Sequence, residues 1–161
     1  MEKFVFEKLP RNLEELKLLK EAELITPFQT AALTILSLNV YSTNEEEGIK
    51  MINFLKGPVE LTPHEISFLK DRFRDKKYVP KSYFDGATPE NNYEPIAPIT
   101  ICVNETPYSY EEEGYAKLFI RSGGADSDRP IKLRQKGKNW YLWEQMLLSD
   151  IKAPVELDPW A

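Results

Sequence analysis

Four helix-start signals follow one another in the first half of the chain, and they constrain the fold more than any other feature. In each, an Asn or Thr is followed three residues later by an acid or an amide. This is the pattern of a capping box, in which both side chains accept hydrogen bonds from backbone N–H groups at the helix start. The pairs are Asn12 with Glu15, Thr26 with Gln29, Thr43 with Glu46, and Thr62 with Glu65. Together they predict four consecutive helices.

The second of these helices differs from the others in its polarity. Residues 27–41 are apolar on almost every side, which predicts a helix buried in the middle of the molecule. Pro27 and Pro63 stand at the first helical position of their segments, where a missing N–H group costs nothing.

Strand-like alternation of apolar and polar residues begins in the second half of the chain. The alternating runs are 99–104, 115–121 and 131–134, and a further run, "NWYLWEQ", follows the turn signal Lys136-Gly137. Their close spacing predicts an antiparallel meander sheet of about four strands, with one face against the helices. The expected fold class is α+β, with an N-terminal four-helix layer packed on a C-terminal sheet.

The 161 residues, 42% of them hydrophobic, suit a single domain with one core. We expect a helical part over 1–77, a long connecting loop over 78–98, the sheet over 99–145 and an extended tail over 146–161. Trp160 in this tail is expected to be either packed on the body or exposed.

Composition excludes several classes of function. The formal net charge of -5 argues against a nucleic-acid partner. One cysteine and one histidine, Cys102 and His64, cannot form a cysteine or multi-histidine metal site, so we expect no metal and no cofactor. No stretch reaches the roughly 18–20 apolar residues of a membrane span. With no signal-peptide pattern at the start either, the expected location is cytoplasmic.

The loop over 78–98 is the first candidate site, because loops longer than about 12–15 residues are uncommon in compact domains and tend to be functional or disordered. Its rings and amides argue against disorder, and the residues singled out are Tyr83, Asp85, Asn91, Asn92 and Tyr93. Two interpretations remain open. The loop is either a strap between the helices and the sheet or one wall of a binding groove.

A second candidate site is one face of the predicted sheet, where aromatic rings alternate with cations. The residues are Tyr115, Lys117, Phe119, Arg121, Lys132 and Arg134, with Tyr141 and Trp143 nearby in register. Such a face suits an extended acidic ligand, because rings stack and cations meet the ligand's charge. It is also typical of an ordinary solvated sheet. Arg121 and Trp143 join the candidate binding residues.

Several motifs resemble a family of small uncharacterised bacterial proteins, found mainly in Firmicutes. They are "FLKGP", "SYFDGATPENNY", "PYSYEEEGYAKLFIRSGGADS", "IKLRQKGKNWYLWEQ" and "DPWA". The resemblance implies a bacterial source and no known activity. The segment "IKLRQKGKNWYLWE" is also similar to the last hairpin of the nuclear-transport-factor-2-like cone. The four consecutive helices depart from the usual element order of that fold.

No set of residues forms a recognisable nucleophile, base or metal centre, so catalytic residues are unknown. The leading hypothesis is a non-catalytic binding or protein-interaction module, with a groove between the 78–98 loop and the sheet. The alternative is a small-molecule-binding protein or enzyme with a cone-type pocket, using Asp85, Tyr93, Arg121 or Glu144 as polar groups. The expected partner is accordingly a protein or a small molecule.

Overall fold

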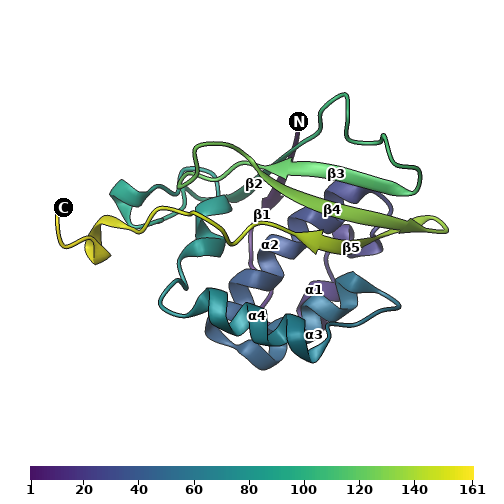
Figure 1. The fold of residues 1–161 in the computed structure, drawn as a ribbon, viewed down its shortest axis with the longest axis horizontal. Coiled ribbons are helices and arrows are strands. Elements are labelled where there is room, and N and C mark those ends of the chain that lie inside the picture. Colours follow the sequence, from purple (N-terminus) through teal and green to yellow (C-terminus); the bar gives the residue numbers. More distant parts are fainter.

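The computed structural model describes residues 1–161, and its elements form an α+β fold (Figure 1). The helices are α1 (Leu13–Lys17), α2 (Pro27–Thr43), α3 (Glu45–Lys56) and α4 (Pro63–Phe73). The strands are β1 (Glu2–Phe6), β2 (Ile99–Asn104), β3 (Tyr115–Ile120), β4 (Arg129–Lys136) and β5 (Asn139–Gln145). Short 3-10 turns occur at Lys20–Glu23, Val79–Tyr83, Pro89–Asn91 and Val155–Leu157.

The sheet has five antiparallel strands in the order β1-β2-β3-β4-β5, one more than the sequence pattern predicted. The additional strand is β1, which pairs with β2 from Glu2 opposite Val103 to Phe6 opposite Ile99. Phe6 is buried and Phe4 packs against the core, whereas Lys3 is exposed. The signal for β1 was therefore present as alternation in "KFVF", but its charged neighbours and its distance from the other strands hid it.

Helix α2 is the centre of the fold, as its apolar sequence predicted. It is buried along nearly its whole length and packs against β2, β3, β4 and β5 on one side and α3 on another. Most of its buried hydroxyl groups have partners: Thr34 donates to the carbonyl of Thr30 and Ser37 to that of Leu33, whereas the buried hydroxyl of Tyr41 has none. Thr30 donates instead to the carbonyl of Trp140 at 2.6 Å, which fixes β5 against the helix.

The helices do not form the single four-helix layer that we expected. Only α2 lies broadly against the sheet, while α3 and α4 lie farther from the sheet than α2 does (Figure 1). Helix α3 also reaches β5 at the edge of the sheet. The reason is that α2 has apolar side chains on all sides, so it needs cover on both the sheet side and the α3 side. None of the helices has both the length and the apolar character needed to cross a membrane.

Three of the four predicted caps are the residues that the sequence indicated. Thr26 and Thr62 form complete capping boxes with Gln29 and Glu65. Asn12 accepts from the N–H of Glu15, but the Glu15 carboxylate turns to Arg11, whose guanidinium lowers its pKa to about 2.

The cap of α3 is Asn44, and the prediction of Thr43 was wrong by one residue. Asn44 accepts from the N–H of Glu47 at 3.2 Å, and it also ends α2. Thr43 is still helical and donates its hydroxyl hydrogen to the carbonyl of Val40. Both residues suit a cap by type, and the correct one depends on where α2 ends.

Gly48 allows the close approach of α2 and α3, because a Cβ there would lie 2.4 Å from Cα of Tyr41.

Replacing Asn44 and Thr43 one at a time tests which of them caps α3. We expect Asn44→Ala to lower the free energy of unfolding by about 1 kcal/mol, because an N–H group at the start of α3 loses its partner. Thr43→Ala, the matched control, should change it by less than about 0.5 kcal/mol. Urea unfolding measures both, and an equal or larger loss for Thr43→Ala would contradict the assignment of the cap.

Candidate functional site

The 78–98 loop, here called the strap, is ordered by its own rings. Tyr83, Phe84 and Tyr93 are buried. The hydroxyl of Tyr83 donates to the carbonyl of Leu147, and the hydroxyl of Tyr93 donates to that of Lys152. Burial raises the pKa of both phenols, that of Tyr93 to about 12, so both keep the proton that they donate. The rings thus connect the strap to the C-terminal tail.

The amides of the strap hold backbone groups of the chain itself. The side-chain oxygen of Asn91 accepts from the N–H groups of Thr88 and Glu94, and its nitrogen donates to the carbonyl of Gly86. Asn92 has a left-handed backbone with φ 58°. Its side-chain oxygen accepts from the N–H of Glu156 at 2.9 Å, which joins the strap to the tail a second time.

A small hollow lies between the strap and the sheet, where the sequence hypothesis expected a groove. Its volume is about 80 Å³, and its lining includes Asp85, Arg121 and Cys102. Asp85 and Arg121 face each other at 4.0 Å. Burial raises the pKa of the Cys102 thiol, so it stays protonated. Known ligand sites span roughly 300–1,000 Å³, so this hollow is small for a ligand.

A larger groove lies at the other end of the sheet, between the α3–α4 connection and the β4–β5 hairpin. Its volume is about 670 Å³. The residues that line it are Lys56, Pro58, Val59 and Glu65 on the helical side, and Arg134, Gln135, Lys136, Tyr141, Leu142, Trp143 and Glu144 on the hairpin. A second hollow of about 190 Å³ continues it between β5 and α4. We call the larger one the hairpin groove.

Arg134 is the most distinctive side chain of the hairpin groove. Its guanidinium lies over the ring of Trp143 at 4.6 Å and over the ring of Tyr115 at 5.5 Å. The two rings meet edge to face at 5.7 Å. The guanidinium has no carboxylate partner and donates no hydrogen bond within the chain. Its position is therefore fixed by aromatic contacts, while its N–H groups stay available.

Lys132, on the same face, shows the contrast. Its ammonium group also lies over the ring of Tyr115, at 4.7 Å, but it donates to the Glu112 carboxylate at 2.7 Å. This hydrogen bond raises the pKa of Lys132. Lys132 therefore has a carboxylate partner, whereas Arg134 has none.

A β-bulge shapes the hairpin side of the groove. Leu133 pairs with Leu142, but Lys132 pairs with Glu144, so Trp143 is an extra residue in β5. Since Lys132 belongs to the outer face of the sheet, its partner Glu144 lies on that face together with Trp143. The bulge therefore presents two neighbouring side chains to the groove.

Gly57 fixes the opposite wall. It ends α3 with φ 72°, and a Cβ at this position would lie 2.5 Å from Cδ1 of Tyr141. The glycine therefore lets the chain pass directly against the Tyr141 ring. Next to it, Lys56 has a side chain only 10% exposed, and its ammonium nitrogen lies 3.8 Å from Oε2 of Glu65.

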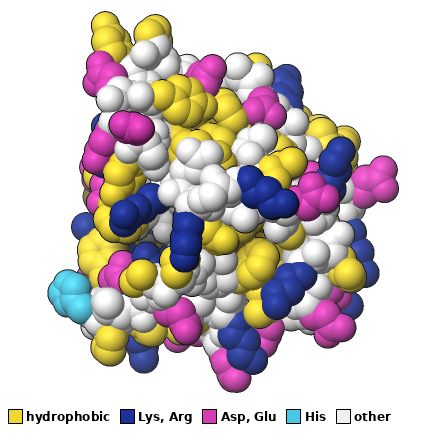
Figure 2. All heavy atoms as spheres, turned by 90° about the vertical axis from the view of Figure 1, so that its right-hand side faces the viewer, with side chains coloured by type: hydrophobic (Ala, Val, Ile, Leu, Met, Phe, Trp, Pro, Cys, Tyr) yellow, Lys and Arg dark blue, Asp and Glu magenta, His cyan; other side chains and the backbone are white.

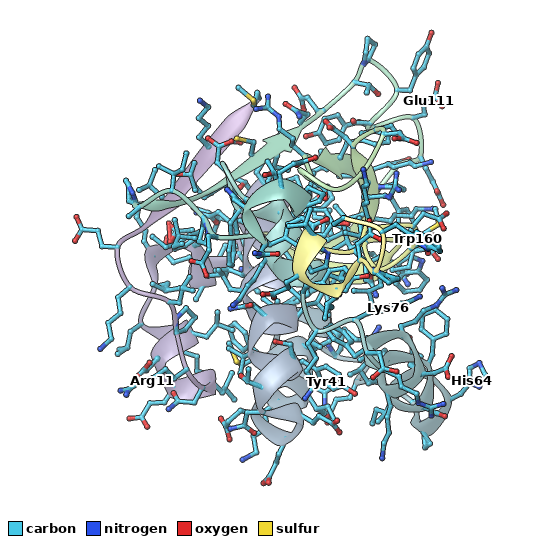
Figure 3. The ribbon with its side chains drawn as sticks, turned by 90° about the vertical axis from the view of Figure 1, so that its left-hand side faces the viewer. Arg11, Tyr41, His64, Lys76, Glu111 and Trp160 are labelled. Carbon is cyan, nitrogen blue, oxygen red and sulfur yellow. The ribbon has the colours of Figure 1, made fainter.

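The face of Figure 2 shows how charge is distributed around this end of the molecule. Lys and Arg side chains cross its middle with hydrophobic side chains between them, and acidic side chains lie mainly around them. His64 lies apart from this pattern, because it points outward from the start of α4 (Figure 3). No group of three or more His, Cys, Asp or Glu side chains is arranged to hold a metal ion.

Comparison with known proteins identifies a family. A family model described as a domain of unknown function (DUF6935) matches residues 8–155. The chain belongs to this family. The strap, all four helices and strands β2 to β5 lie within the matched span, and so does the hairpin groove. No curated protein and no solved structure matches the chain.

The candidate residues of this DUF6935 domain fall into three places. Asp85 and Arg121 meet at the small hollow, which Tyr83 also lines, and Trp143 lines the hairpin groove. The other four, Tyr83, Asn91, Asn92 and Tyr93, bond the strap to itself or to the tail. The polar groups named for a cone-type pocket do not converge either, because Glu144 lies in the hairpin groove.

The residues of the hairpin groove differ in how clearly the sequence indicated them. Arg134 and Tyr141 belong to the ring-and-cation face that the strand alternation indicated, although neither was chosen as a binding residue. Lys56 and Val59 had no signal, because only the tertiary fold brings the end of α3 over β5.

The contact of Gly57 with Tyr141 can be tested by a pair of glycine replacements. Gly114 also has a positive φ, of 83°, but a Cβ at that position would have no atom within 4 Å, so Gly114→Ala is the control for backbone strain alone. Gly57→Ala adds the clash of a Cβ with the Tyr141 ring to a backbone of φ 72° and ψ -123°, which lies outside the regions open to alanine. We expect it to lower the free energy of unfolding by more than Gly114→Ala does, and its effect to become smaller when Tyr141 is also replaced by Ala. Equal losses in the two single variants would contradict the contact.

The junction between the strap and the tail gives a second prediction. Asn92→Gly keeps the left-handed backbone and deletes the side chain that accepts from Glu156. We expect the amide of Glu156 to exchange faster with solvent, while the free energy of unfolding falls by only about 0.5–1.5 kcal/mol. Hydrogen exchange followed by NMR measures this. The amide of Glu94, held by Asn91, is the internal control and should not change.

Proposed function

We propose that the chain is a non-catalytic binding module, and that its hairpin groove holds an acidic peptide segment carrying an aromatic side chain. The observation that carries this proposal is Arg134, whose guanidinium lies over two neighbouring rings, those of Trp143 and Tyr115, without any partner for its N–H groups. A guanidinium offers planar, paired donors that match a carboxylate. Since the rings already restrict its motion, little further entropy is lost when a carboxylate binds.

The size and polarity of the hairpin groove support a large apolar side chain beside that carboxylate. At about 670 Å³ it falls within the range of roughly 300–1,000 Å³ of known ligand sites. Pro58, Val59, Tyr141 and Trp143 supply apolar and aromatic surface along its walls. Aromatic side chains bind well to such surfaces, because rings in edge or offset contact gain energy beyond the buried area.

The charges around the hairpin groove favour a ligand with few negative charges. Three cations, Lys56, Arg134 and Lys136, line it together with two acids, Glu65 and Glu144, which leaves one net positive charge. A polyanion such as single-stranded nucleic acid needs a continuous run of cations, and the chain as a whole carries -5. One or two carboxylates on a peptide fit this balance better.

This proposal moves the binding site away from the strap. The sequence hypothesis set the groove between residues 78–98 and the sheet, but the hollow there is about 80 Å³, and the strap's amides already have partners. The cone-type alternative has less support, since Asp85, Tyr93, Arg121 and Glu144 do not share one pocket. As the setting, we propose the cytoplasm of a bacterium, which agrees with a single thiol that is buried and unpaired.

The test uses seven-residue peptides with blocked ends, each containing one Trp or Tyr and two Asp or Glu. A matched set has Lys in place of the acids. We expect the dilute protein to bind members of the acidic set and not the Lys set, as followed by fluorescence anisotropy. Arg134→Ala should weaken binding about tenfold or more, because a charge-assisted hydrogen bond contributes about 1.5–3 kcal/mol.

Lys117→Ala is the control, since it removes one positive charge from the same sheet face but outside the hairpin groove. It should bind the acidic peptides nearly as well as the wild type. Equal weakening by Lys117→Ala and Arg134→Ala would point to unspecific attraction and contradict the proposal. So would tighter binding of a single-stranded oligonucleotide, or no binding of any acidic peptide.

A further inference from the structure

We infer that the segment held in the hairpin groove is the end of the tail, residues 157–161, of a second copy of this chain. This inference rests on the proposed function, for which it names the partner. It starts from Trp160, whose side chain is 93% exposed, whereas Trp143 is 41% exposed. Tryptophan is highly buried on average, so an indole this exposed is a natural anchor for an interface.

The tail holds Trp160 away from the body of its own chain. The N–H of Lys152 donates to the carbonyl of Gly124, and Asn92 accepts from the N–H of Glu156. Tyr93 holds the carbonyl of Lys152 from the other side. The tail is therefore fixed up to Glu156, and beyond it the chain leads away from the body (Figure 1), which leaves Trp160 exposed.

Residues 157–161 carry the chemistry that the hairpin groove calls for. Asp158 accepts from the N–H of Trp160 at 2.8 Å, so a carboxylate and an indole are held next to each other. Leu157, 58% exposed, adds apolar surface. The segment from 155 to 161 contains two acids, Glu156 and Asp158, and no basic residue. Its carboxylate matches the unpaired Arg134, and its indole matches the rings of Tyr141 and Trp143.

The tail cannot fill the hairpin groove of its own chain. Five residues span at most about 18 Å when fully extended. A chain of 161 residues has a radius of gyration of about 15 Å, and therefore a width of about 40 Å. The tail ends at one side of the molecule and the β4–β5 hairpin lies at the opposite side (Figure 1). Residues 157–161 can therefore enter only the hairpin groove of another copy.

This arrangement has consequences for the assembly. Tail and groove are different surfaces, so the contact is head to tail, and each bound copy still offers a free groove and a free tail. Growth beyond a dimer follows with rising concentration. The contact is also small, since five residues bury far less than the roughly 1,200–2,000 Å² of a stable interface, so we expect weak, reversible association.

The experiment is sedimentation of the full chain at rising concentration, with two variants that each remove one half of the contact. Trp160→Ala keeps the groove and loses the anchor of the tail, while Arg134→Ala keeps the tail and impairs the groove. We expect the wild type to pass from monomer to dimer and larger species, and each variant alone to associate at least about tenfold more weakly. An equimolar mixture of the two variants should form dimers and nothing larger, because only one productive junction is left.

Several results would overturn the inference. They are a wild type that stays monomeric, association that Trp160→Ala leaves intact, and a variant mixture that associates no better than its components. The acidic peptides, titrated into Trp160→Ala, distinguish the two proposals. If they bind while these sedimentation results fail, the groove takes a foreign segment and only the present inference is lost. If they do not bind either, the proposed function fails as well.

Discussion

The burial of α2 is the constraint on which the rest of this structure depends. A helix with apolar side chains all round is stable in water only if other elements cover it on every side. The sheet covers one side, where the hydroxyl of Thr30 joins the buried helix to the carbonyl of Trp140 in β5. Helix α3 covers another side, so its C-terminal end arrives next to β5, and there the chain turns at Gly57 against the Tyr141 ring. The hairpin groove is thus bounded by a connection whose path is set by core packing and by a hairpin whose bulge presents Trp143.

Much of the fold could be predicted from local signals, and the errors have local causes. Capping residues and proline marked the four helices, and the meander strands showed their period of two. Thr43 was chosen as a cap because either Thr43 or Asn44 satisfies the pattern, and only the packing of α2 decides between them. Strand β1 was missed because its partner β2 lies more than ninety residues away, so no turn motif in the sequence indicated that the two strands pair.

The candidate site was harder to predict, because its parts come from segments that are distant in sequence. Strand alternation placed Arg134 and Trp143 on one face, and this much was visible. That Arg134 lacks a carboxylate while Lys132 has Glu112 depends on the path of the loop between β2 and β3, which no pattern encodes. Aromatic and amide residues in the strap drew attention for a sound reason, since such residues in a long loop need partners. Their partners are backbone groups of the strap and the tail.

The bonds between the strap and the tail explain why the strap carries so many polar side chains although it lies far from the hairpin groove. Without Tyr93 and Asn92, residues 152–156 would keep only one of their three hydrogen bonds to the body, the one from the N–H of Lys152 to the carbonyl of Gly124. An exposed tryptophan on such a loosened segment could fold back onto its own apolar surface. Held by these two side chains, the tail keeps a fixed direction away from the body, so less entropy remains to be lost when Trp160 binds. The strap, which holds the tail, and the hairpin groove therefore serve the same contact between copies from opposite ends of one rigid fold.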